Sequence, residues 1–192
     1  MLELKNTIIY LIGYPGVGKL TTAVALCAIT GAILMDNHMV NNPVFKLVGA
    51  DGQGPIPAAV WDKVKAVRDV FFTTIRDAAP QQLNYVLTNV LLDGPGDRDL
   101  FAQVVDLAAQ RGGLFVPVVL RCREEEMYRR VASPERLAKM KGTDPKRLRG
   151  LISHRPLLPV AHPNLLELDN TALPADESAR VIIDHVQGLI KL

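Results

Sequence analysis

Short apolar segments alternate along the chain with longer segments in which apolar residues recur at helical spacing. The apolar segments, which read as buried strands, cover residues 7–12, 32–36, 85–92, 114–120 and 164–168. The clearest helical segment ends at Pro80 and places one apolar face at steps of three or four residues: Val60, Val64, Val67, Phe71 and Ile75. Further helices are predicted over residues 19–30, 100–110 and 123–141, the last interrupted at Ser133-Pro134, and then from Thr143 and from near Pro174.

This alternation predicts an α/β fold whose sheet is mostly parallel and covered by helices on both faces. Residues 37–56 contain many asparagines, glycines and prolines and predict an irregular or partly helical excursion. Pro117 weakens the prediction of the fourth strand, because proline has no backbone N–H to donate to a strand ladder. The inner face of the last helix is expected to carry four apolar residues: Ala179, Ile182, Val186 and Ile190.

Length and composition favour one domain over residues 1–192. Apolar residues make up 48% and charged residues 22%, which is typical of globular proteins and argues against a disordered chain. The apolar runs are too short to span a bilayer, and the N-terminus lacks the pattern of a secretory signal. Cys27 and Cys122 make neither a disulfide framework nor a metal cluster, so a reducing, cytoplasmic location is expected.

Positive charge gathers in one part of the chain. Residues 121–155 hold 11 Lys/Arg against 5 Asp/Glu, a local net charge of +6; because the whole chain carries +2, the remainder carries −4. Such a block suits a polyanion, whether the phosphates of a nucleotide, a phosphorylated substrate or RNA, and it also fits a solvated helix face.

A glycine loop between the first strand and the first helix is the most specific feature. Residues 13–19 read GYPGVGK and fit the phosphate-loop pattern GxxxxGK. Glycines let successive backbone N–H groups turn inward around an anion, and the following helix directs the positive end of its dipole to the same place. The lysine adds a charge that reaches the β- and γ-phosphates. The predicted nucleotide contacts are Gly13, Pro15, Gly16, Val17, Gly18 and Lys19.

The position after the lysine departs from this pattern. Leu20 stands where a serine or threonine ordinarily touches magnesium, and a leucine side chain cannot ligate a metal. A hydroxyl follows at Thr21, so Leu20 and Thr21 are kept as nucleotide contacts and Thr21 as a candidate metal ligand. Two interpretations stay open: either Mg²⁺ is held through water and phosphate oxygens, or the loop is a degraded binder.

The run Gly-Lys-x-Thr at residues 18–21 resembles the loop of adenylate kinases and related nucleoside monophosphate kinases. With the aspartate that ends the second strand, the arginine-rich segment and the late run LDNT, the chain is similar to the wider superfamily of small P-loop kinases, which includes adenylate, shikimate, gluconate and chloramphenicol kinases. The resemblance implies a three-layer α/β/α P-loop NTPase fold with a five-stranded, mostly parallel sheet and a short helical lid. It also implies ATP and Mg²⁺ as cofactors and Lys19 as a catalytic residue.

The same resemblance places an acceptor site near residues 37–80. Asp36 ends the second strand, where an aspartate of the shikimate- and gluconate-like kinases orients or deprotonates the acceptor hydroxyl. Alternatively, Asp36 caps the next turn or touches the water shell of a metal. His38, two residues on, is a candidate substrate contact and also fits a surface or capping role.

Three more polar residues are candidates. Arg68 on the long helix could hold an anionic substrate group, and Asn89 lies within the third strand near the expected acceptor site. Asp93 is a candidate second metal ligand, although an aspartate before Gly94 also fits a turn.

The basic segment gains a role from the resemblance. In the small P-loop kinases an arginine on the helix after the fourth strand stacks over the adenine, and Arg130 lies at that position. A lid follows, here about residues 129–145, in which Arg136 or the nearby Lys139 and Lys141 would reach the phosphates; Arg136 is taken as the catalytic candidate.

The chain is therefore interpreted as an ATP-dependent phosphotransferase that moves the γ-phosphoryl group to a hydroxyl of a small molecule, such as a sugar acid, a cyclic polyol or an antibiotic. A nucleoside monophosphate kinase would need more arginines over residues 37–80 than Arg68 and Arg76. Leu20 favours a non-catalytic nucleotide-binding module, and the basic segment an RNA-end kinase, although 5% aromatic residues offer little base stacking. The expected partners are a nucleotide and a small-molecule acceptor, without membrane or nucleic acid, and the oligomeric state stays open.

Overall fold

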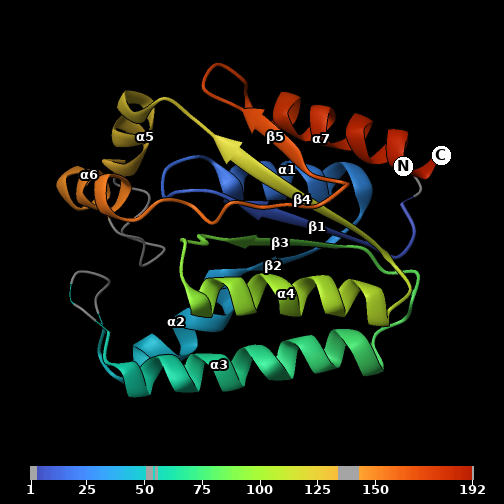
Figure 1. The fold of residues 1–192 in the computed structure, drawn as a ribbon, viewed down its shortest axis with the longest axis horizontal. Helices are drawn as coiled ribbons and strands as arrows, with labels where there is room; N and C mark the ends of the chain where they lie inside the picture. The colour runs from blue at the N-terminus through green and yellow to red at the C-terminus, as the bar shows by residue number, and fades with distance from the viewer. Residues whose placement is uncertain (1–3, 51–53, 55, 134–142, 192) are drawn as a thin grey trace.

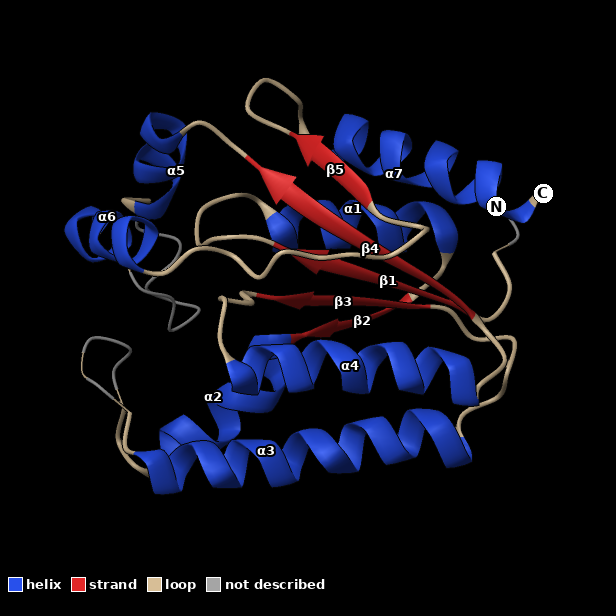
Figure 2. Ribbon diagram, viewed as in Figure 1, coloured by secondary structure: helices blue, strands red, loops and turns tan. Residues whose placement is uncertain are grey.

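The five apolar segments form the strands of one sheet. The structure, a computed structural model, describes residues 4–50, 54, 56–133 and 143–191. Its sheet has the order β2-β3-β1-β4-β5, and each pair of neighbouring strands runs parallel (Figures 1 and 2). The strands are β1 (Thr7–Ile12), β2 (Ile33–Asp36), β3 (Tyr85–Asn89), β4 (Leu114–Arg121) and β5 (Leu166–Asp169).

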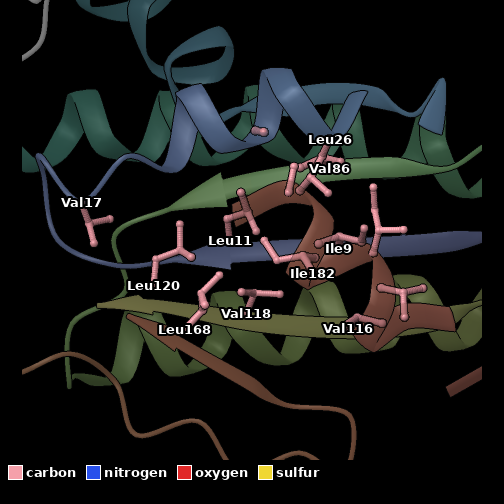
Figure 3. Close-up of a cluster of buried hydrophobic side chains, with 14 of the residues drawn as sticks. Ile9, Leu11, Val17, Leu26, Val86, Val116, Val118, Leu120, Leu168 and Ile182 are labelled. Carbon is pink, nitrogen blue, oxygen red and sulfur yellow. The ribbon is translucent and has the colours of Figure 1, made fainter. Parts of the chain in front are cut away.

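The central strand β1 is buried on both faces, which explains why its sequence is apolar without alternation. Ile9 and Leu11 belong to the core on one face, whereas Ile8, Tyr10 and Ile12 belong to the core on the other. Figure 3 shows Ile9 and Leu11 among apolar side chains from the neighbouring strands and helices. The predicted three-layer α/β/α architecture is confirmed.

Two sets of helices cover the two faces. Helices α1 (Lys19–Thr30) and α7 (Ala175–Ile190) pack on the first face, and α3 (Ala58–Thr73) and α4 (Pro95–Gln110) on the second (Figure 2). The remaining helices are α2 (Asn37–Leu47), the π-helical turn η1 (Thr74–Ala78) that extends α3, α5 (Glu124–Val131) and α6 (Pro145–His154). Among the residues that the structure describes, no helix has the length and apolarity needed to cross a membrane.

Several predicted boundaries were wrong for local reasons. The excursion after β2, in contrast, is partly helical as predicted, with Pro43 inside α2. Strand β3 ends at Asn89 rather than at residue 92. Helix α4 starts at Pro95 rather than at residue 100, because proline suits the first helical turn and Asp97 accepts the Leu92 N–H at 2.8 Å. Ile190, expected on the inner face of α7, is half exposed.

Pro117 is tolerated because of where it lies in β4. The Asn164 side chain donates to the carbonyl of Phe115 at 2.9 Å, so the backbone groups of Phe115 face the β5 side. Backbone groups alternate along a strand, which puts Pro117 on that same side. There the ladder with β5 begins only at Val118, so the missing N–H falls at the start of the ladder.

A buried arginine fastens the end of the long helix. Arg111 is only 3% exposed, and its guanidinium donates to the carbonyls of Ile75, Pro80 and Gln81. Its charge also lies 5.3 Å from the centre of the Tyr85 ring. One side chain thus joins the last turn of the long helix to the segment that follows it.

Candidate functional site

The glycine loop follows β1 at the carboxyl ends of the central strands, where ligands bind in open α/β sheets. Gly16 and Gly18 have φ angles of 86° and 102°, which non-glycine residues rarely adopt. A Cβ atom on Gly16 would lie 2.8 Å from the carbonyl oxygen of Met127, so α5 packs directly against the loop. The loop therefore has the glycine-dependent geometry of an anion cradle, and the residues present fit a nucleotide phosphate.

Two side chains from distant segments hold the loop in place. The carbonyl of Val17 accepts the Asn170 Nδ2–H at 2.8 Å and an Arg130 N–H at 3.2 Å. Arg130 also donates to the carbonyls of Asn170 and Thr171, at 3.4 and 3.3 Å. Because the Val17 carbonyl accepts both bonds, the loop is tied to both α5 and the segment after β5.

Lys19 lies back along the loop. Its ammonium donates to the carbonyls of Gly13 and Tyr14, at 2.6 and 2.9 Å. These contacts keep the ammonium group beside the cradle. From there the group needs to move only a short way to hydrogen-bond a phosphate oxygen.

Asp36 stands at the end of β2, but its side chain does not cap α2. The carboxylate instead accepts the Thr88 hydroxyl at 2.5 Å through Oδ1 and approaches His38 Nδ1 at 3.1 Å through Oδ2. Thr88 is brought there by strand pairing, since it is the partner of Asp36 in the β2–β3 ladder. The capping interpretation of the Asp36 side chain is therefore wrong.

One cleft of about 640 Å³ connects these groups. Of the predicted residues, it is lined by Pro15, Gly16, Gly18, Lys19, Leu20, Thr21, Asp36, His38 and Arg130. Asn170 and Ser178, which were not predicted, also line it and hold buried oxygen atoms that have no hydrogen-bond partner in the described part of the chain. Asn170 lies in the run LDNT, whereas Ser178 within α7 carries no sequence signal.

The remaining predicted residues lie elsewhere. Gly13 and Val17 do not line the cleft, but their carbonyl groups accept hydrogen bonds from Lys19 and Asn170, which do. Asp93 does not line the cleft and is ion-paired with Arg98, so it is not brought to the nucleotide loop. Arg136, together with the predicted lid cations Lys139 and Lys141, lies outside the described residues.

Arg68 and Asn89 line a smaller cavity of about 30 Å³. This cavity shares Asn37 and Thr88 with the main cleft. Burial raises the pKa of Tyr10, which lines it and is hydrogen-bonded to Asn89, so the phenol stays neutral. The Arg68 Nε is buried and has no hydrogen-bond partner among the described residues. The small cavity thus offers polar groups directly beside Asp36.

Arginines of α5 form the opposite wall. Glu126 accepts hydrogen bonds at 2.7 Å from both Arg129 and Arg130, and these bonds lower the pKa of Glu126 to about 2. The carboxylate stays ionised and orients Arg130 against the loop.

The predicted metal ligands do not form a site. Leu20 lines the cleft without an oxygen ligand, whereas the Thr21 hydroxyl donates its hydrogen to the Gly18 carbonyl at 2.8 Å and keeps its oxygen lone pairs. Asp93 is outside the cleft, as described above. Within the described ranges no group of three His, Cys, Asp or Glu side chains could hold a metal ion. The described residues therefore offer no ready-made set of three such ligands, and a Mg²⁺ ion in this cleft would take most of its ligands from phosphate and water oxygens.

Comparison with known proteins identifies the family. The family model described as AAA domain matches residues 8–147, which is more than half of the chain. The chain belongs to the AAA domain family. The matched part of this AAA domain includes the glycine loop, Asp36, His38 and Arg130. No curated protein matched the sequence.

Solved structures show the same fold. A gluconokinase from Sinorhizobium meliloti is 16% identical to this AAA domain, with a TM-score of 0.60 over 97% of this chain and 94% of the other. An APS kinase from Mycobacterium tuberculosis, solved with AMPPNP and APS, is 18% identical with a TM-score of 0.57 over 95% and 98%. A shikimate kinase from Acinetobacter baumannii, solved with shikimate, is 15% identical with a TM-score of 0.53 over 97% and 96%. The fold is therefore that of the small P-loop kinases.

Proposed function

We propose that this protein is an ATP-dependent phosphotransferase that moves the γ-phosphoryl group to a hydroxyl of a small molecule. The observation that carries the proposal is that the glycine cradle with Lys19 and the Asp36–His38 pair line the same cleft. One side suits a triphosphate, and the other holds the hydrogen-bonded basic groups that phosphoryl transfer needs beside the acceptor.

The nucleotide would be bound by the loop and the arginine wall. The backbone N–H groups of the cradle would bind phosphate oxygens, and Lys19 would exchange its two loop carbonyls for phosphate. Arg130, held by Glu126, would contact the base. Mg²⁺ would arrive with the nucleotide and be held by phosphate oxygens and water, because Leu20 leaves the loop without a hydroxyl at that position.

The acceptor would enter beside Asp36 and reach the smaller cavity. Arg68 suits an anionic group, and Asn89 suits a hydroxyl or carbonyl group. This combination favours an acceptor with both hydroxyl and acidic groups. The gluconokinase and the shikimate kinase with the same fold have names that indicate acceptors of this class.

The test is incubation of the full chain with ATP and single acceptors, namely gluconate, shikimate, adenosine 5′-phosphosulfate and thymidylate, with mass spectrometry of the products. One acceptor should gain a phosphoryl group. Lys19→Met should lower the rate about 10²- to 10³-fold, because it removes a charge at the transferred group. Lys65→Met, at an exposed position of α3, is the matched control and should leave the rate unchanged.

A non-catalytic nucleotide-binding module is the second candidate, and Leu20 favours it. ATP binding that depends on Lys19, without product from any acceptor, would support that function. Absence of ATP binding would overturn both the phosphotransferase function and the non-catalytic binding function.

A further inference from the structure

Both oxygen atoms of the Asp36 carboxylate are engaged. Oδ1 accepts the Thr88 hydroxyl at 2.5 Å, and Oδ2 lies 3.1 Å from His38 Nδ1. The Asp36 side chain is 10% exposed, whereas the His38 side chain is 30% exposed and also lines the cleft. An incoming acceptor would therefore reach the imidazole more readily than the carboxylate.

The hydrogen bonds also determine which ring nitrogen of His38 is basic. An ionised carboxylate only accepts hydrogen bonds, so Nδ1 must carry the hydrogen that it shares with Asp36. In the neutral ring the lone pair then resides on Nε2, at the other edge of the imidazole. The part of the chain that the structure describes gives Nε2 no hydrogen-bond partner.

We propose that Nε2 of His38 accepts the proton of the acceptor hydroxyl, while Asp36 positions the ring and stabilises the imidazolium. This inference rests on the phosphotransferase function proposed above. In the step, the acceptor oxygen forms a bond to the γ-phosphorus, the bond from that phosphorus to the bridging oxygen breaks, and ADP leaves with the electron pair. The acceptor proton moves to Nε2 and returns to water after the product has left.

The charges around His38 suit this assignment. Lys19, Arg129 and Arg130 line the cleft as cations, and Glu126 is already bonded to both arginines. Asp36 is thus the cleft carboxylate that is hydrogen-bonded to the ring and can offset an imidazolium. On the elements packed against α2, β2 contributes Asp36 and β3 no charged group.

Helix α3, the other element packed against α2, also places a cation near His38. Arg68 lines the small cavity next to Asn37. The remaining charged residues of α3 are exposed: Asp62, Lys63, Lys65 and Asp69. On α2 itself, Lys46 lies at the far end of the helix. The cleft carboxylate therefore remains the direct partner of the ring.

The tautomer can be measured without any acceptor. In ¹⁵N-histidine-labelled protein near neutral pH, long-range ¹H–¹⁵N correlation spectra distinguish protonated from unprotonated ring nitrogens. The chain has four histidines, and the signal lost in His38→Gln assigns His38. The expected form has hydrogen on Nδ1 and a bare Nε2. In Asp36→Asn the amide can donate to Nδ1, so the population should move toward the Nε2–H form. Hydrogen on Nε2 in the unmodified protein would overturn the proposal.

Kinetics test the proton transfer, with ATP and whichever probe acceptor is phosphorylated fastest. The kcat of the unmodified protein should fall toward acid pH, because a protonated imidazole cannot accept the proton of the acceptor hydroxyl. His38→Gln should lower kcat about 10²- to 10⁴-fold, remove that acid limb and leave the KM for ATP unchanged. His154→Gln, at an exposed histidine, is the matched control. An acid limb that persists in His38→Gln, or near-normal turnover, would overturn this inference alone. Absence of transfer to every acceptor would overturn the proposed function and the inference with it.

Discussion

Replacing Gly16 by alanine tests how the phosphate cradle is built. Alanine at this position meets two penalties: the φ angle of 86°, and a Cβ placed 2.8 Å from both the Met127 carbonyl oxygen and a methyl group of Val131. The carbonyl is backbone and cannot rotate away, so either α5 or the loop must shift. Gly49 separates the two penalties, because its φ is 66° but its Cβ would meet no described atom within 4 Å.

The expected change in the free energy of unfolding differs between Gly16→Ala, Gly49→Ala and a control variant. Gly49→Ala should lower the free energy of unfolding by about 1–2 kcal/mol, the cost of a left-handed backbone for a residue with a Cβ. Gly16→Ala should add an overpacking cost of about 1–3 kcal/mol, for a total of about 2–5 kcal/mol. Gly150→Ala, at an exposed position inside α6 with ordinary φ, should stabilise by about 0.5–1 kcal/mol.

Urea unfolding measures the three stabilities, and calorimetric titration with ATP measures affinity. Gly16→Ala should weaken ATP binding at least tenfold, because its loop must move, whereas Gly49→Ala and Gly150→Ala should bind as the unmodified protein does. If Gly16→Ala and Gly49→Ala lose equal stability and bind ATP equally well, α5 does not pack against the loop as described, and the account of the cradle is wrong.

Three further substitutions probe the supports of the cleft and the sheet. The pKa of Glu126 is about 2, against an ordinary 4.5, so its arginine contacts stabilise the fold fully above pH 4.5 and this stabilisation is lost as the pH falls toward 2. In Glu126→Gln the free energy of unfolding, measured from pH 2 to 4.5, should therefore depend less on pH. Arg111→Met should lower the free energy of unfolding by about 2–4 kcal/mol in urea titrations, without changing ATP affinity, because the carbonyls that it binds precede β3, at the end of the strands opposite the glycine loop. Asn170→Ala removes the bond to Val17, which should cost about 1–2 kcal/mol and weaken ATP binding about fivefold by calorimetry; unchanged affinity would contradict its role in holding the loop.

The fold was predictable because its strongest signals are local. A strand buried on both faces must be continuously apolar, and residues 7–12 carry that pattern with a glycine directly after it. Helix α1 was predicted at its observed bounds because Gly31 adopts the left-handed conformation that ends it. The start of α4 was predicted at residue 100 and lies at Pro95, because proline fits a first helical turn.

The site was predictable only where one segment contains it. The glycine loop and Asp36 follow directly from strand ends, so sequence alone located them. Their partners come from pairings that sequence does not display: Thr88 reaches Asp36 through the β2–β3 register, and Asn170 reaches Val17 across 153 residues. Asp93 was misjudged because its ion pair with Arg98 depends on α4 starting early.

The charges that line the cleft explain how a phosphate loop can function with leucine at position 20. A magnesium-binding hydroxyl contributes an oxygen ligand but no charge, so losing it leaves the electrostatic attraction between loop and phosphates intact. That attraction comes from the helix dipole of α1, from Lys19 and from Arg129 and Arg130, which share one carboxylate between them. What Leu20 removes is the fixed position of a metal relative to the loop. In the proposed enzyme, alignment of the transferred phosphate would then fall on Lys19 and on the backbone N–H groups of the loop, so turnover should depend on these groups rather than on the residue after the lysine.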